Sequence, residues 1–310
     1  MIFLDEITFV NEWWRAIKSK IDSGELSGDV LTITGSASME LMNQKEFFPG
    51  RRGNGKDYLM MPLNFSEYAK ILSKIELAKG NIKEIEKNVD ANRMYSSTLK
   101  ELFSNYLKTG GFPRAIIDFH RYGKVSMETM KTYLDSVRGD WAKAGKSEKY
   151  MKEVLTYIIK ASGTPISWNG ISSETGINSP HTARSYIEVL ESIFSIIILH
   201  MLSPQSQILY RKNRKIHFTD PILFKIFSDY AGVKFSEDWL IEGVTAALFG
   251  RICPVFYWRN SSEIDVLCKL DKEQIGFEVT KGIKKWKKPM HIKKAYILDK
   301  EHIHLYIASI

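Results

Sequence analysis

The sequence has little cysteine and no long apolar run. Its 310 residues include only Cys253 and Cys268, too few for a disulfide framework or a cysteine metal cluster, so a reduced, cytoplasmic protein is expected. The best candidate for a membrane span, Ile193–Leu202, is about half as long as the roughly 20 residues required. No basic region precedes the short apolar start, as it would in a signal peptide. We therefore expect no membrane association.

Acidic residues are missing from one basic segment. The net charge is +8, and the segment Lys281–Lys294 holds seven lysines and no acid. Such a run is either a solvated loop or a patch that contacts nucleic-acid phosphates. The candidate DNA contacts in it are Lys281, Lys284, Lys285, Lys287 and Lys288.

The first 35 residues read as strand, helix, strand. Apolar Ile2–Leu4, helical spacing over Phe9–Ile21 and β-branched Val30–Thr34 predict part of a parallel α/β sheet. Asp5 and Glu6 follow the first strand, as in a Walker B motif, where the aspartate holds Mg²⁺ and the glutamate polarises water. Thr34 and Ser36 end the neighbouring strand. They either face a terminal phosphate or form a simple turn.

A credible phosphate-binding loop is absent. Gly50–Lys56 satisfies the spacing G-x-x-x-x-G-K, but Asp57 stands where a hydroxyl should meet Mg²⁺. No convincing strand precedes the segment, and Pro62 falls in the second turn of the helix that should follow. The sequence therefore predicts no nucleotide cradle here.

The middle of the chain reads as helical. Phe65–Lys87 has a helical period, and helices continue over residues 96–160, with a break at Gly110–Pro113. Helices are predicted at Lys149–Lys160, near Ile171–Thr175 and after Ser179. Two β-type runs, Phe194–Leu199 and Lys215–Phe218, follow them and complete a winged-helix outline. His181 and Arg184 at the start of its third helix are candidates for a DNA major groove; such domains also bind protein.

The last part reads as a small α/β unit. A helix near Trp239–Phe249 precedes five predicted strands, which are Val255–Trp258, Ile264–Lys269, Ile275–Thr280, Ala295–Leu298 and His304–Ala308. His302 and His304 are expected on the solvent side. This unit resembles the restriction-endonuclease-like PD-(D/E)xK fold, which implies the metal ligands Glu242, Asp265 and Glu278. Thr280 occupies the position of the motif lysine, and Lys281 is displaced by one residue. Either a β-bulge returns Lys281 to the site, or the site keeps its acids and lacks the lysine.

Motifs along nearly the whole chain resemble an archaeal branch of the AAA-type ATPases. They include FLDEI, TITGSAS, FFPGRRGNGKDYLMMPLNFSEY, YLKTGGFPRAI and RKNRKIHFTDPI. The resemblance implies ATP and Mg²⁺ as cofactors and places Arg51 near the nucleotide. The family begins with a strand, a P-loop and its helix, so we expect a chain lacking roughly 70–100 residues and unable to hydrolyse ATP alone. Its partners would be an upstream-encoded P-loop half, or copies of itself joined at the exposed edge of Ile2–Leu4.

The predicted fold is α/β in four parts. They are a partial AAA-type parallel sheet (1–70), a helical connector (71–147), a winged helix (148–222) and a nuclease-like domain (235–310). The predicted function is that of an AAA-type ATPase family member. The alternatives are a nucleic-acid-binding module with a metal-dependent nuclease-like domain, and a gene fragment with no role of its own.

Overall fold

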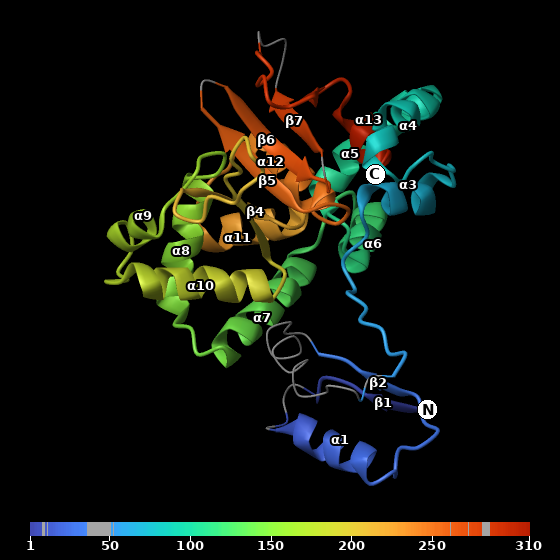
Figure 1. Ribbon diagram of the computed structural model, residues 1–310, viewed down its shortest axis with the longest axis vertical. Helices are drawn as coiled ribbons and strands as arrows, with labels where there is room; N and C mark the ends of the chain where they lie inside the picture. The colour runs from blue at the N-terminus through green and yellow to red at the C-terminus, as the bar shows by residue number, and fades with distance from the viewer. Residues whose placement is uncertain are drawn as a thin grey trace.

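The computed structural model describes residues 1–7, 10, 12–35, 51, 53–260, 262–271, 273–280 and 286–310. Its N-terminal unit is a parallel pair of strands, β1 (Ile2–Leu4) and β2 (Leu31–Ile33), linked by α1 (Trp13–Asp22). This confirms the predicted strand, helix, strand order. In Figure 1 the unit lies at one end of the molecule, and an extended segment leads from it to α3 (Phe65–Ser73).

Short helices follow this segment. Asn64 caps α3 by accepting from the Glu67 amide, and Lys74, in a left-handed conformation with φ 58°, ends it. The single helix predicted over Phe65–Lys87 is therefore wrong, whereas the break at Gly110–Pro113 is confirmed. The elements are η3 (Ile82–Glu84), α4 (Ile85–Asn92), η4 (Arg93–Tyr95), α5 (Ser96–Thr109), α6 (Pro113–Tyr122) and α7 (Met127–Lys143).

Three helices and a hairpin come next, in the predicted order. They are α8 (Glu148–Lys160), α9 (Trp168–Ser173), α10 (Pro180–Ser192), β3 (Ile196–His200) and β4 (Arg214–Phe218), followed by α11 (Pro221–Ala231). β3 and β4 pair antiparallel. Every residue of β4 is buried, and the strand packs on α12 (Glu237–Phe249). The winged-helix identity stays a prediction.

The C-terminal sheet has the order β5-β6-β7-β8, antiparallel except for the parallel pair β7–β8. Its strands are β5 (Val255–Arg259), β6 (Glu263–Lys269), β7 (Gln274–Thr280) and β8 (Lys294–Asp299). α12 contacts β6 and β7.

The predicted last strand is wrong, because Ile303–Ala308 forms the helix α13. A short apolar run cannot be assigned to strand or buried helix from its period alone. α13 packs on α3, α4 and α5. His304 was predicted on the solvent side but is 1 % exposed, with Nε2 3.0 Å from Ser96 Oγ. His302 is exposed as predicted.

One hydrophobic cluster runs from Phe65 to Ile310 and joins α3 to the C-terminal sheet. The expectation of reduced cysteines is wrong, because Cys253 and Cys268 form a disulfide. The bond joins the start of β5 to β6. Both are buried. Within the described ranges, no helix combines the length and apolar character needed to cross a bilayer. The predicted domain boundaries remain predictions.

Candidate functional site

Two of the predicted nucleotide-site residues meet at the edge of the N-terminal unit. Parallel pairing sets Leu4 opposite Ile33, so the residues that follow, Asp5 and Thr34, leave the two strands at the same edge. Thr34 Oγ1 donates a hydrogen bond to the Asp5 carboxylate. Both side chains are exposed, so a ligand in solution can reach them.

A hydrogen bond from its backbone amide places Glu6 at the same edge. Its amide donates to Thr34 Oγ1 at 3.2 Å, and its φ of 48° lies in the left-handed region. A non-glycine residue held in that conformation is a mark of functional sites as well as of turns. The side chain is exposed. Asp5, Glu6 and Thr34 thus form one exposed group, here called the carboxyl edge.

Arg51 lies elsewhere in the N-terminal unit. Its guanidinium binds the Asp22 carboxylate twice, with Nε–Oδ1 at 2.6 Å and Nη2–Oδ2 at 3.0 Å. The hydrogen bond from Arg51 lowers the pKa of Asp22, and the same bond raises the pKa of Arg51. Asp22 ends α1, whereas Glu6 precedes its start. The structure therefore does not bring Arg51 to the carboxyl edge.

The remaining predicted elements of this site are only partly described. Ser36 and Gly50 lie outside the described residues. Lys56 is exposed, and the chain after it forms neither helix nor strand until α3 begins at Phe65. A phosphate-binding loop leads directly into a helix whose first amides face the phosphate. The described residues 57–64 form no such helix, as expected if Gly50–Lys56 is not a phosphate-binding loop.

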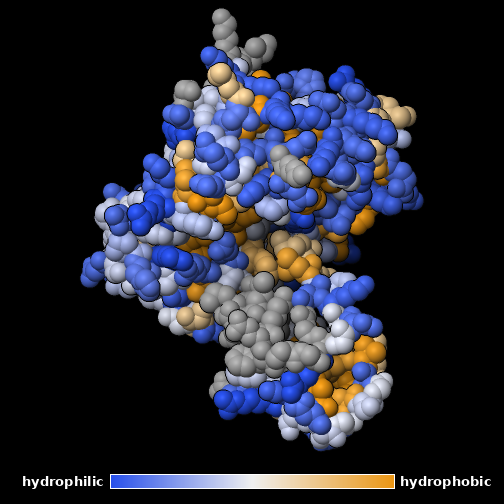
Figure 2. Space-filling view, viewed as in Figure 1, coloured by the Kyte–Doolittle hydropathy of each residue, from blue (hydrophilic) through white to orange (hydrophobic). Residues whose placement is uncertain are grey.

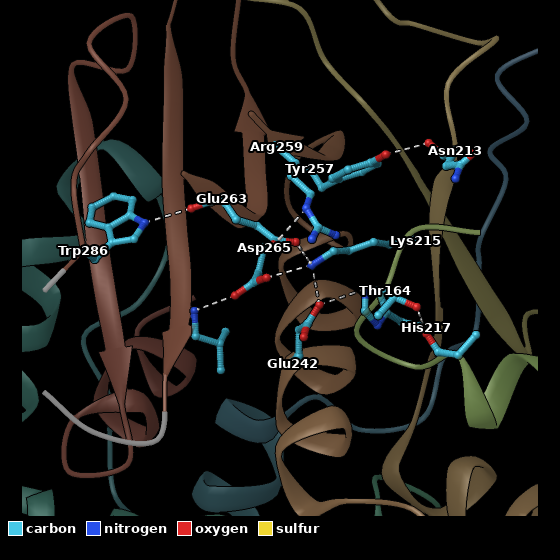
Figure 3. A network of polar contacts seen from close by, with 12 residues as sticks. Thr164, Asn213, Lys215, His217, Glu242, Tyr257, Arg259, Glu263, Asp265 and Trp286 are labelled. Carbon is cyan, nitrogen blue, oxygen red and sulfur yellow. Dashed lines mark hydrogen bonds and ion pairs between the residues drawn. The ribbon is translucent and has the colours of Figure 1, made fainter. Parts of the chain in front are cut away.

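The second group of functional side chains is buried in the C-terminal half (Figure 3). Lys215 of β4 points from the hairpin toward α12 and β6, and its side chain is 1 % exposed. Its Nζ lies 2.8 Å from Glu242 Oε1, 2.8 Å from Glu263 Oε1 and 2.7 Å from Asp265 Oδ1. We call these three acids the carboxylate cluster.

The charges of this cluster follow from burial and proximity. Burial alone would lower the pKa of Lys215, but Asp265, Glu242 and Glu263 outweigh it and raise that pKa, so the ammonium stays charged. Burial, and then the charge of Asp265, raises the pKa of Glu242 to about 7.

His217, also on β4, lies beside the cluster. It is buried, and burial together with Lys215 lowers its pKa to about 3, so the ring is neutral at physiological pH. Its Nε2 lies 3.7 Å from Glu242 Oε1 and has no hydrogen-bond partner among the described residues.

Backbone bonds hold the cluster in place. Asp265 Oδ2 accepts from the Val279 amide at 3.0 Å, which ties β6 to β7. The Glu263 carbonyl accepts from Trp286 Nε1 at 2.9 Å. The first contact orients the Asp265 carboxylate, and the second holds the backbone of Glu263.

The structure partly unites the predicted metal ligands. Glu242 and Asp265 meet at Lys215, and Glu278 is buried on the neighbouring strand β7. Within the described parts of the chain, no three His, Cys, Asp or Glu side chains are placed to hold a metal ion. Lys281, the displaced lysine, lies outside the described residues.

Sequence reasoning missed Glu263 and Lys215. Alternation along a strand places Glu263 on the same face as Asp265, and this signal was available. Lys215 opens the predicted β-type run Lys215–Phe218, and a lysine in an otherwise buried strand requires paired acids. No local pattern showed which acids these were, because Lys215 and Asp265 are 50 residues apart.

The predicted nucleic-acid contacts lie on two separate surfaces. His181 and Arg184 are exposed near the start of α10, where Arg184 Nε pairs with Glu188 Oε1 at 2.7 Å. Lys287 and Lys288 are exposed after the basic segment. Lys281, Lys284 and Lys285 lie outside the described residues.

Comparisons with known proteins give two matches in order along the chain. Residues 1–69 match a family described as an AAA domain. Residues 100–230 match a domain of unknown function (DUF8612). No curated protein and no solved structure matches. The AAA match covers the carboxyl edge and supports an AAA-type ATPase-like N-terminal region.

Proposed function

We propose that the chain works as an AAA-type, nucleotide-handling protein whose carboxyl edge takes the Mg²⁺ and terminal phosphate of ATP. The single observation that supports this most is the contact between Asp5 and Thr34 at the exposed edge of two parallel strands. The AAA match over residues 1–69 makes an ATPase-related function the coherent interpretation of this edge.

Each residue of the edge has a role that suits its chemistry. The carboxylate oxygens of Asp5 are the hard ligands that Mg²⁺ prefers. Glu6 would polarise the attacking water, and the Thr34 hydroxyl would contact the terminal phosphate. Arg51 would neutralise developing charge only after leaving Asp22, which holds it at the far end of α1. ATP and Mg²⁺ are thus the proposed cofactors.

The phosphate-gripping loop is proposed to come from outside these 310 residues. The candidate partners are a P-loop segment encoded upstream and a second copy of the chain. Met1, Phe3 and Val30 are 72, 68 and 59 % exposed. Figure 2 shows apolar side chains gathered over the N-terminal unit. These exposed apolar side chains, next to the carboxyl edge, support a partner that binds this face.

ATP turnover by purified protein tests the proposal. The 310-residue chain with Mg²⁺ and ATP should show no turnover above background. Addition of an upstream-encoded segment carrying G-x-x-x-x-G-K-[ST] should produce turnover that Glu6→Gln reduces at least 100-fold and Glu12→Gln leaves unchanged. The opposite result is ATP turnover by the chain alone that Glu6→Gln abolishes. It would show that the phosphate-binding loop lies within these residues, and it would overturn the proposal that the loop comes from a partner.

A second candidate function is nucleic-acid binding without cleavage. Exposed Lys287 and Lys288 close the acid-free basic segment and favour it, because clustered lysines release counterions from DNA. Fluorescence anisotropy with duplex DNA should show salt-dependent binding that Lys287→Glu/Lys288→Glu weakens and the exposed-site control Lys131→Glu does not. Equal binding by both variants would remove this candidate.

A further inference from the structure

We infer that the ammonium of Lys215 is the resident cation of the carboxylate cluster. It fills the position that a divalent metal would need between Glu242, Glu263 and Asp265. The native cluster therefore takes no metal ion, and removal of the ammonium turns it into a divalent-cation site. This inference is independent of the proposed nucleotide function, since it concerns the other half of the chain.

Nζ donates hydrogen bonds to Glu242 Oε1 and Asp265 Oδ1, and Glu263 Oε1 lies at ion-pair distance. An ammonium has three N–H donors, and three carboxylates from two elements surround it at 2.7–2.8 Å. At 1 % side-chain exposure, Lys215 has no room for a water shell. A metal ion at this point would have to displace Nζ, because the same oxygens serve both.

The charges show what happens when Lys215 is removed. Three acids face the Lys215 ammonium, and Arg259 Nε lies 3.8 Å from Glu263 Oε2. Without Lys215 the buried carboxylates lose their main counter-charge, a costly state that draws in another cation or protons. Carboxylate oxygens bind Mg²⁺ or Mn²⁺ well, and they would need to close by about 0.7 Å to reach Mg²⁺–oxygen distances.

His217 supplies the second observation. Its ring is 3 % exposed, and its Nε2, unpartnered among the described residues, lies 3.7 Å from the Glu242 oxygen that Lys215 binds. An imidazole nitrogen is an ordinary ligand for Mn²⁺. The site thus contains a nitrogen ligand that Lys215 leaves unused.

The experiment measures Mn²⁺ binding to the full chain by the loss of the free-ion EPR signal. Wild type and Asp265→Asn should bind the same amount of Mn²⁺, because the native cluster holds none. Lys215→Ala should gain one Mn²⁺ site at least tenfold tighter than any wild-type binding, and Lys215→Ala/Asp265→Asn should lose it. Lys212→Ala, an exposed lysine near the start of β4, serves as the matched control and should gain nothing.

Two outcomes would overturn the inference. One is a wild-type Mn²⁺ site that Asp265→Asn removes. The other is a folded Lys215→Ala chain that binds no Mn²⁺. If Lys215→Ala does not fold without metal, its melting temperature in Mn²⁺ decides, and Lys215→Met repeats the test with the side-chain volume retained. Because the Asp265 dependence identifies the site, Mn²⁺ bound at Asp5 cannot be mistaken for it.

Discussion

Single buried polar groups decide how the helices meet in this molecule. Asp220 is buried where α11 begins, and it accepts from the Ile222 amide at 2.9 Å and from the Gly111 amide at 2.8 Å. One carboxylate therefore caps α11 and also holds the turn between α5 and α6. Burial raises the pKa of Asp220 to about 6 in spite of these bonds.

Asp220 should stabilise the fold more at pH 5 than at pH 7.5. Its folded pKa of about 6 exceeds the ordinary 3.8. The folded chain therefore binds the proton more tightly, and this stabilisation fades as pH rises through about 6. The gap in unfolding free energy between wild type and Asp220→Ala should be about 1 kcal/mol wider at pH 5. Urea unfolding at both pH values measures it, and a gap that is constant or wider at pH 7.5 would contradict the assignment.

Gly111 has no room for a side chain. A Cβ there would lie 1.9 Å from the carbonyl oxygen of Leu63, which is backbone and cannot swing away. Gly111→Ala should lower the free energy of unfolding by more than about 2 kcal/mol. Gly139→Ala in α7, where nothing lies within 4 Å, should instead raise it by about 0.5–1 kcal/mol. Equal effects of the two substitutions in urea unfolding would refute this contrast.

At the scale of elements, the hairpin β3–β4 and the C-terminal sheet are joined through α12. β4 supplies Lys215, β6 supplies Glu263 and Asp265, and α12 supplies Glu242 between them. The disulfide then ties the start of β5 to β6 within the same sheet.

Reduction of the disulfide should weaken this sheet. Cys253 and Cys268 are 15 residues apart, and closing a loop of that length stabilises a fold by up to about 3 kcal/mol. Dithiothreitol should therefore lower the melting temperature of wild type. The melting temperature of the double variant Cys253→Ala/Cys268→Ala should not change on addition of dithiothreitol. A wild-type melting temperature that does not respond to the reductant would show that the bond contributes nothing.

Elements with a strong local signal could be predicted from the sequence, and those fixed by distant contacts could not. Ile2–Leu4 and the break at Gly110–Pro113 came from apolar runs and turn residues. α13 was missed because its six mostly apolar residues fit a strand equally well until α3, α4 and α5 surround them. The carboxyl edge followed from strand ends alone, whereas the role of Lys215 depends on three elements meeting in space.

At the scale of the whole molecule, the N-terminal unit is joined to the larger body by an exposed segment. Tyr58, Leu59 and Met60 are 87, 60 and 98 % exposed and lie in neither helix nor strand. From Phe65 onward most buried apolar side chains belong to one hydrophobic cluster, and a smaller second cluster includes Phe256 and Leu267 of the C-terminal sheet. The two parts should therefore respond differently to a protease.

Limited proteolysis should cut this segment first. Chymotrypsin should cleave after Tyr58 and trypsin after Lys56, because exposed backbone outside regular structure is the preferred substrate. The fragment that begins there should resist further cleavage, since its helices and sheets are packed on a common core. Mass spectrometry of early digests identifies the cut, and early cleavage within β4–β7 would contradict the account.

The central claim is that a magnesium–nucleotide complex binds at Asp5 and Thr34. Iron-directed cleavage measures this directly, because Fe²⁺ replaces Mg²⁺ in the ATP complex and, with ascorbate and peroxide, cuts the backbone beside the bound metal. With the upstream-encoded P-loop segment present, we expect ATP-dependent cuts flanking Asp5 and Thr34, lost in Asp5→Asn and retained in Glu12→Gln, with none beside Asp265. Cuts beside Asp265 in wild type, or none near Asp5 at saturating ATP, would contradict the account.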